Sequence, residues 1–123
     1  MSTTQTARER ARDEITAEIL AAARARLAEV GPAALSLRSV ARDVGMVSSA
    51  VYRYFPSRDD LLTALLVQAY DEIGHAAETA DPGGDPVTRW LSVCRAARQW
   101  AREHQHEWAL LYGSPAIGYA APR

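Results

Sequence analysis

Residues 37–58 read LRSVARDVGMVSSAVYRYFPSR, and they predict two short helices separated by Gly45. Apolar residues in the first segment recur at helical spacing and define one buried face. Ala41 is small at the point where a second helix would cross the first. Four residues later, Gly45 can adopt the left-handed backbone of a tight turn. Val51 follows six residues after Gly45 and can pack against the first helix, so the joint spacing predicts a helix-turn-helix.

The second of these helices is expected to cover Ser48–Tyr54. Its face opposite Val51 carries serine, tyrosine and arginine side chains, which would be exposed. A recognition helix places its N-terminal residues against base edges in the major groove. There serine can donate a hydrogen bond to bases or phosphates or accept one, and arginine favours guanine. The alternative is a pair of packed helices with a solvated polar face.

The rest of the chain also follows a helical period, and no strand pattern occurs, which predicts an all-α fold. Apolar residues spaced by three or four predict a helix from Asp13 to Val30, ended by Gly31–Pro32. Ser57 is expected to open a helix that runs to about Ala77. After the linker at residues 81–86, a helix up to His104 and a further turn around Trp108 are expected.

The charge distribution separates two halves of the 123-residue chain. Residues 1–58 contain nine Arg and six Asp or Glu, a net +3, whereas residues 59–123 contain five Arg and nine acidic residues, a net −4. Only the first half is therefore expected to meet a polyanion. The single cysteine excludes an intrachain disulfide. No apolar run reaches membrane-spanning length and no signal peptide is evident, so a cytoplasmic location without membrane contact is expected.

The stretch LSLRSVARDVGMVSSAVYRYFPSRDDLL, residues 35–62, resembles the DNA-binding segment of the TetR family of bacterial transcriptional regulators. The resemblance extends over about residues 10–75. More loosely, EHQHEWALLYGSPAIGYAAP, residues 103–122, is similar to the regulatory domain of actinobacterial members. The resemblance implies a three-helix DNA-binding domain at 1–57 with a helix-turn-helix, followed at 58–123 by part of a helical ligand-binding and dimerisation domain.

The function that this resemblance implies is that of a regulator, most simply a repressor and not an enzyme. It would bind a palindromic double-stranded DNA operator as a homodimer and be released by a small apolar effector. Members of the family usually continue into two further helices that form the dimer interface, so this chain is expected to dimerise weakly by itself. The alternative is a helical-bundle interaction or ligand-binding protein that does not bind DNA.

The resemblance also assigns DNA contacts by position. It implies that Arg38 touches the backbone or a flanking base, that Ser48, Ser49, Ala50 and Arg53 face bases, and that Tyr52, Tyr54 and Arg58 meet phosphates or sugar edges. Phe55 is expected to be buried in the core between the DNA-binding helices and the helix that follows Ser57. Two positions depart from the family pattern: Val47 cannot cap the recognition helix, which shifts the expected cap to Ser48, and Ala50 offers only a methyl group.

Aromatic residues in the second half are candidates for an effector pocket, although core packing is the simpler explanation of each single residue. The candidate lining residues are Tyr70, Trp90, Cys94, Trp108 and Tyr112, with Trp100 and His104 beside them. His104 and His106 lie on different faces of a helix and make a poor chelating pair, so no metal site is expected. No cofactor is expected either. Near the N-terminus, Arg8, Arg10 and Arg12 are either an arm that enters a minor groove or a disordered tail.

Overall fold

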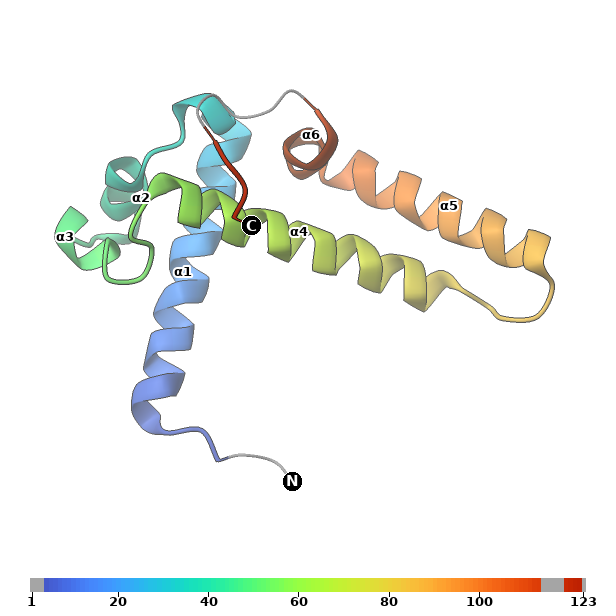
Figure 1. Ribbon diagram of the computed structural model, residues 1–123, viewed down its shortest axis with the longest axis horizontal. Coiled ribbons are helices and arrows are strands. Elements are labelled where there is room, and N and C mark those ends of the chain that lie inside the picture. The colour runs from blue at the N-terminus through green and yellow to red at the C-terminus, as the bar shows by residue number, and fades with distance from the viewer. Residues whose placement is uncertain (1–3, 114–118, 123) are drawn as a thin grey trace. The chain divides into compact units, whose positions relative to one another are not determined.

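The computed structural model describes residues 4–113 and 119–122, and the regular structure in these ranges is entirely helical (Figure 1). This confirms the all-α prediction. The elements are α1 (Ala7–Val30), the 3₁₀ turn η1 (Pro32–Ala34), α2 (Leu37–Val44), α3 (Ser48–Val51), α4 (Arg58–Ala80), α5 (Pro86–Glu103) and α6 (Gln105–Tyr112). The chain forms two compact units, Met1–Leu62 and Thr63–Arg123, which divide inside α4. None of the helices described is long and apolar enough to cross a bilayer.

The first helix begins at Ala7, six residues earlier than expected, because a capping box closes its N-terminus. The Thr6 hydroxyl accepts a hydrogen bond from the Glu9 backbone N–H at 3.1 Å, and the Glu9 carboxylate accepts one from the Thr6 N–H at 2.9 Å. These reciprocal bonds satisfy donors that a helix start otherwise leaves unpaired. Residues 8–12 are consequently helical, and the expectation of an arm or a disordered tail for their three arginines is wrong.

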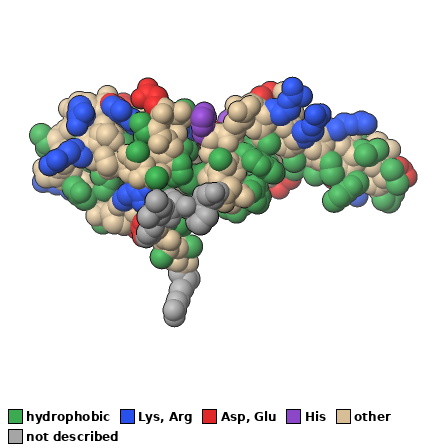
Figure 2. Space-filling model, turned by 90° about the horizontal axis from the view of Figure 1, so that it is seen from above, with side chains coloured by type: hydrophobic (Ala, Val, Ile, Leu, Met, Phe, Trp, Pro, Cys, Tyr) green, Lys and Arg blue, Asp and Glu red, His purple; other side chains and the backbone are tan. Residues whose placement is uncertain are grey.

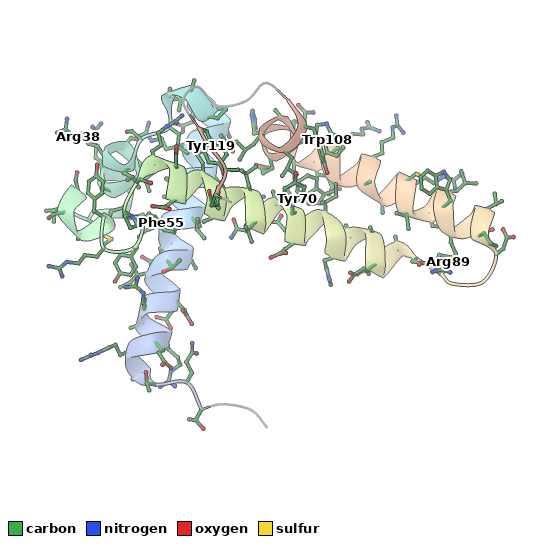
Figure 3. All side chains as sticks on the ribbon, in the orientation of Figure 1. Arg38, Phe55, Tyr70, Arg89, Trp108 and Tyr119 are labelled. Carbon is green, nitrogen blue, oxygen red and sulfur yellow. The ribbon has the colours of Figure 1, made fainter. Side chains whose placement is uncertain are left out.

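The core of the first unit lies where α1, α2, α3 and the start of α4 meet. Its buried apolar residues are Ile19, Ala23, Leu27, Leu35, Leu37, Val40, Ala41, Val51, Phe55, Leu61 and Leu62. The expected stripe of α1 is confirmed at three of these positions, whereas Val30 at its end is 43% exposed. Phe55 is buried as predicted, at the passage from α3 to α4 (Figure 3).

Short polar caps set the starts of α4 and α5. The Ser57 hydroxyl accepts from the Asp60 N–H at 3.1 Å at the start of α4, and Asp85 accepts from the Thr88 N–H at 2.9 Å before α5. The cap at Ser57 was expected from the sequence, and Asp85 is the same kind of short polar N-cap residue. Arg89 of α5 donates two hydrogen bonds, at 2.9 and 2.8 Å, to Asp81 in the linker before that helix. These bonds, with one from the Gly83 N–H, lower the pKa of the Asp81 carboxyl to about 2.

Few residues of the second unit are buried, and α5 exposes much of its apolar side. Leu65, Ala69, Trp100 and Glu107 are the buried positions described there. Figure 2 shows hydrophobic and arginine side chains together on the surface of this unit. Most of the expected C-terminal loop, at 114–118 and at 123, lies outside the described residues. Tyr119 is described, and its hydroxyl lies 2.8 Å from the Thr63 hydroxyl.

Candidate nucleic-acid interface

The turn between α2 and α3 has the backbone that the sequence predicts. Gly45 has φ 72° and ψ 28°, in the left-handed region. The Met46 N–H donates to the Ala41 carbonyl at 2.9 Å, and the Gly45 N–H donates to the Arg42 carbonyl at 3.2 Å. This pair of bonds is a Schellman motif, which satisfies the last carbonyls of α2 and redirects the chain. The close approach of Met46 to the Ala41 carbonyl fixes where α3 begins.

Replacing Gly45 with valine is expected to lower the free energy of unfolding by about 1–3 kcal/mol. A Cβ atom at Gly45 would meet no atom within 4 Å, so the cost comes from the positive φ alone and not from a clash. Denaturant unfolding measures the change. Gly74→Ala is the matched control, because Gly74 lies within α4 without a positive φ and alanine should stabilise that helix. Equal effects of the two substitutions would contradict the strained turn.

The second helix of the motif is shorter than expected, and it starts without a side-chain cap. It covers Ser48–Val51, with Val47 at the N-cap position, so the expected cap at Ser48 is wrong. Residues 52–54 form turns whose backbone bonds continue the winding: the Tyr54 N–H donates to the Val51 carbonyl at 2.9 Å, and the Phe55 N–H donates to the same carbonyl at 3.0 Å. The predicted recognition segment is therefore one helical turn followed by tight turns.

The side chains expected to meet DNA lie on the outside of this segment. Val51 is fully buried, while Tyr52 is 49% exposed. Of the other expected contacts, Arg38, Ser49 and Arg53 are exposed, and Ser48, Ala50 and Tyr54 are half-buried. In Figure 3, Arg38 projects from α2 away from the core. The structure thus brings seven of the eight expected residues to the surface around α2, α3 and the following turns.

Arg58, the eighth residue, has a different role in the structure. Its Nε donates to the Leu35 carbonyl at 2.9 Å, and a terminal nitrogen donates to the Pro32 carbonyl. These bonds join the start of α4 to the segment between α1 and α2. With its guanidinium directed at backbone carbonyls, Arg58 is a brace of the first unit, and the expected phosphate contact has no support from its position.

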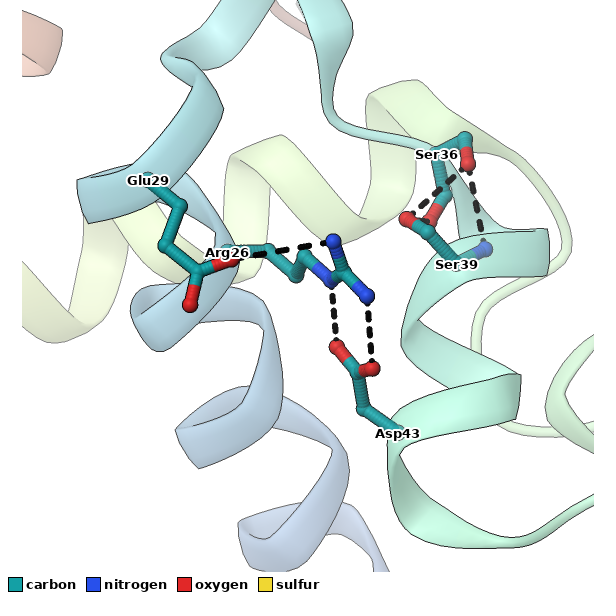
Figure 4. Close-up of polar contacts among 5 residues, drawn as sticks. All are labelled: Arg26, Glu29, Ser36, Ser39 and Asp43. Carbon is teal, nitrogen blue, oxygen red and sulfur yellow. Dashed lines mark hydrogen bonds and ion pairs between the residues drawn. The ribbon is translucent and has the colours of Figure 1, made fainter.

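A second brace joins α1 to α2, and sequence reasoning did not find it (Figure 4). Arg26 donates to the two carboxylate oxygens of Asp43 at 2.6 and 2.8 Å, and Glu29 lies 3.7 Å from the same guanidinium. At the N-terminal end of α2, the Ser36 hydroxyl accepts from the Ser39 N–H at 3.1 Å and caps the helix. The Arg26–Asp43 pair and the Ser36 cap together fix α2, the first helix of the motif.

The Arg26–Asp43 pair should make stability depend on pH. The hydrogen bonds from Arg26 lower the pKa of Asp43 below its ordinary value of 3.8. The stabilisation is therefore fully present above pH 3.8 and is lost as pH falls through the lowered pKa of the folded state. We expect Asp43→Asn to lower the melting temperature at pH 7 and the difference from wild type to shrink below pH 3.8. A difference that stays constant from pH 7 to pH 2 would contradict this.

Three of the aromatic residues expected to line an effector pocket meet in the second unit. The rings of Tyr70 and Tyr112 are 6.2 Å apart and nearly perpendicular, and Trp108 lies 4.5 Å from Tyr112. Tyr70 and Trp108 come from α4 and α6 (Figure 3). Trp100 of α5 is buried, and its ring stacks on that of His104 with centroids 4.7 Å apart. Aromatic pairs with this geometry stabilise packing, so the cluster by itself does not require a ligand.

The other two expected lining residues lie in open grooves. Cys94 and Trp108 belong to a groove of about 510 Å³ along α5 and α6, which also includes Arg98 and Arg102. Trp90 lies in a separate groove of about 290 Å³. Neither groove brings the five expected residues together, and their role in binding an effector stays a prediction. Trp90 lies near the start of α5 and is 69% exposed.

The chain is similar to regulators along both halves. Residues 19–65 match the model of bacterial regulatory proteins of the tetR family, and residues 90–123 match that of the tetracyclin repressor-like C-terminal domain. It is 48% identical over 118 residues to the HTH-type transcriptional regulator Rv1816 of Mycobacterium tuberculosis strain H37Rv, a match that covers 91% of this chain and 49% of that protein.

Two further proteins extend the comparison. The HTH-type transcriptional repressor LfrR of Mycolicibacterium smegmatis is 42% identical over 77 residues, 63% of this chain and 40% of LfrR. The crystal structure of the regulatory protein SCO4313 superposes with a TM-score of 0.85 at 37% identity, covering 95% of this chain and 56% of that one. The chain spans about half the length of the relatives it matches. From its two matched segments and its helix-turn-helix, the chain belongs to the tetR family of bacterial regulatory proteins.

Proposed function

We propose that the protein is a transcriptional regulator, most simply a repressor, that binds duplex DNA through α3 and the turns after it. The observation that carries the proposal is the Schellman turn at Gly45, which buries Val51 and leaves Ser49, Tyr52 and Arg53 exposed. A helix presented this way fits the major groove, where arginine recognises guanine and serine bonds bases or phosphates. Such a regulator acts on chromosomal DNA and hence in the cytoplasm.

The charges around this surface support a polyanionic partner. Residues 1–58 carry a net +3. Asp43, the acidic residue of α2, is held by Arg26, whereas Arg38 and Arg53 are exposed. Lys and Arg near phosphates displace condensed counterions from DNA, and this gain does not depend on sequence. We assign Arg38 to the DNA backbone and Arg53 to a base edge.

Sequence-specific binding by one short recognition segment is weak, which favours a homodimer on a palindromic operator. Two recognition segments related by a two-fold axis read two half-sites about one helical turn apart. LfrR is named a repressor, and that name supports repression as the simplest outcome of binding.

Salt-dependent binding to duplex DNA tests the proposal against the alternative of an interaction or ligand-binding bundle. The complete protein would first select duplexes from a random pool. Fluorescence anisotropy would then measure the Kd for a selected duplex and for its scrambled counterpart over a range of salt concentrations. We expect tighter binding to the selected duplex and a Kd that rises steeply with salt. Failure to enrich any sequence, together with binding that is independent of salt, would favour the alternative.

We also propose that a small, mostly apolar effector releases the DNA by binding the second unit. The cluster of Tyr70, Trp108 and Tyr112 offers an aromatic surface. The buried indole Nε1–H of Trp100 has no hydrogen-bond acceptor among the described residues, so an effector with a carbonyl or ether oxygen would suit it. Helix α4 begins in the first unit and continues to Ala80 in the second. We therefore assign to α4 the coupling of effector binding to DNA binding.

Tryptophan fluorescence and DNA binding, read together, test the effector proposal. Compounds from a library of aromatic and apolar molecules would be scored for a change in tryptophan emission and for release of the selected duplex. Linkage requires that a compound that weakens DNA binding be bound more weakly by the DNA complex by the same factor, typically about 5- to 150-fold. If compounds that change the emission never alter the Kd for DNA, these aromatic residues only pack against one another and bind no effector.

A further inference from the structure

Arg12 of α1 contacts the recognition segment although 41 positions separate it from Arg53. Its terminal nitrogen donates to the Arg53 carbonyl at 3.2 Å, and its guanidinium carbon lies 4.7 Å from the centre of the Tyr54 ring. This separation is within the range of a cation–π interaction. One side chain therefore holds both the backbone of Arg53 and the ring of its neighbour.

The contact is made where the recognition segment has left regular helix. α3 ends at Val51, and residues 52–54 are turns. Backbone hydrogen bonds hold these turns, and the contact from Arg12 adds a tertiary restraint on the Arg53 carbonyl and the Tyr54 ring. The backbone of Arg12 is held in place, because it lies in the second turn of α1 behind the capping box of Thr6 and Glu9.

We propose that Arg12 is a positioning residue for DNA reading: it orients Arg53 and Tyr54 from α1 and does not itself touch DNA. The inference rests on the proposed function. The planar guanidinium suits this task, because one edge can donate to a carbonyl while its face lies on an aromatic ring. A lysine could lie over the ring or donate to the carbonyl, but it could not do both with the same geometry.

Two other roles for Arg12 predict different results. A phosphate contact would make Arg12→Ala weaken binding to all sequences equally and reduce the salt dependence. A purely structural brace would lower the melting temperature. Positioning instead predicts a loss of affinity confined to the preferred sequence, with the salt dependence retained, because the base contact of Arg53 is misplaced while the charge that meets the phosphates stays.

Arg8 provides the matched control for the loss of a positive charge. It precedes Arg12 by four residues, lies on the same face of α1 and is exposed. Arg8→Ala thus removes the same charge one turn away from the recognition segment. Any effect of this substitution on DNA should be equal for selected and scrambled duplexes.

The experiment compares wild type, Arg12→Ala, Arg12→Lys and Arg8→Ala in the complete protein, with a duplex selected by the wild type and its scrambled counterpart. We expect Arg12→Ala to weaken binding to the selected duplex about threefold to tenfold, to leave the scrambled duplex within about twofold, and to keep the salt dependence and melting temperature. Arg12→Lys should recover part of the affinity. If no duplex can be selected by the wild type, the proposed function fails before Arg12 is tested.

A double-mutant cycle with Tyr54→Leu completes the test. If Arg12 acts through Tyr54, Arg12→Ala should weaken binding less in the Tyr54→Leu background than in the wild type. Equal weakening on the selected and scrambled duplexes, a flattened salt dependence or an unchanged affinity for the selected duplex would each overturn the proposal. A melting temperature lowered together with both affinities would assign Arg12 a structural role only.

Discussion

Arg53→Ala is expected to weaken binding to the selected DNA by about 1–3 kcal/mol per half-site, which raises the Kd by roughly 5- to 150-fold for each half-site. Arg53 is exposed directly after α3, on a segment fixed by the burial of Val51 and Phe55. An arginine in this place can donate two hydrogen bonds to guanine, and alanine offers none. The weaker binding should therefore be accompanied by relaxed base preference at one position of each half-site, which selection with the variant would reveal.

Arg38→Ala is the control, since it removes an equal charge from the exposed side of α2. We assign Arg38 to the DNA backbone, so its replacement should weaken selected and scrambled duplexes alike and reduce the salt slope by about one for each phosphate that Arg38 meets. The base preference should not change. If both substitutions leave the affinity for the selected duplex unaltered in an anisotropy titration, the recognition surface is assigned to the wrong residues.

The helix-turn-helix could be predicted from the sequence because its requirements are local. Ala41, Gly45 and Val51 lie within eleven residues, and each is demanded by one steric or backbone condition. The structure confirms all three: two are buried, and the glycine has a positive φ. Caps at Ser36, Ser57 and Asp85 followed from equally local chemistry.

Contacts between residues far apart in sequence could not be predicted in this way. Arg26 and Asp43 are 17 positions apart, and Arg12 and Arg53 are 41 apart. An exposed arginine on a helix has many possible partners, and its choice depends on how the helices cross. The same reason explains Arg58, whose position at the start of α4 suggested a phosphate contact while its guanidinium donates to carbonyls of its own unit.

The start of α1 was missed for a different reason. Apolar periodicity marks only the part of a helix that packs against a core, and residues 7–14 of α1 are all exposed. Thr6 and Glu9 have the residue types and the three-residue spacing of a capping box, and this local signal could have placed the start correctly. The position of the three N-terminal arginines on a helix, and so the contact of Arg12 with Tyr54, depends on that cap.

Phe55→Ala is expected to lower the free energy of unfolding by about 3–5 kcal/mol, a large share of what holds a small domain folded. Phe55 is 7% exposed, and truncating a buried phenylalanine removes apolar burial and leaves a cavity. Phe55→Leu keeps most of the volume and should cost less than about 1.5 kcal/mol. Denaturant unfolding followed by circular dichroism would measure both.

Tyr52→Ala, three residues earlier, is the matched comparison because the two aromatic residues share a segment but differ in burial. Tyr52 is 49% exposed, so its removal should change the free energy of unfolding by less than about 0.5 kcal/mol while it weakens DNA binding. Phe55→Leu should do the reverse, with little effect on the Kd under conditions where the protein stays folded. A large loss of stability from Tyr52→Ala, or a small one from Phe55→Ala, would mean that the segment packs with another face inward. In that case the exposed surface assigned to DNA would belong to the core.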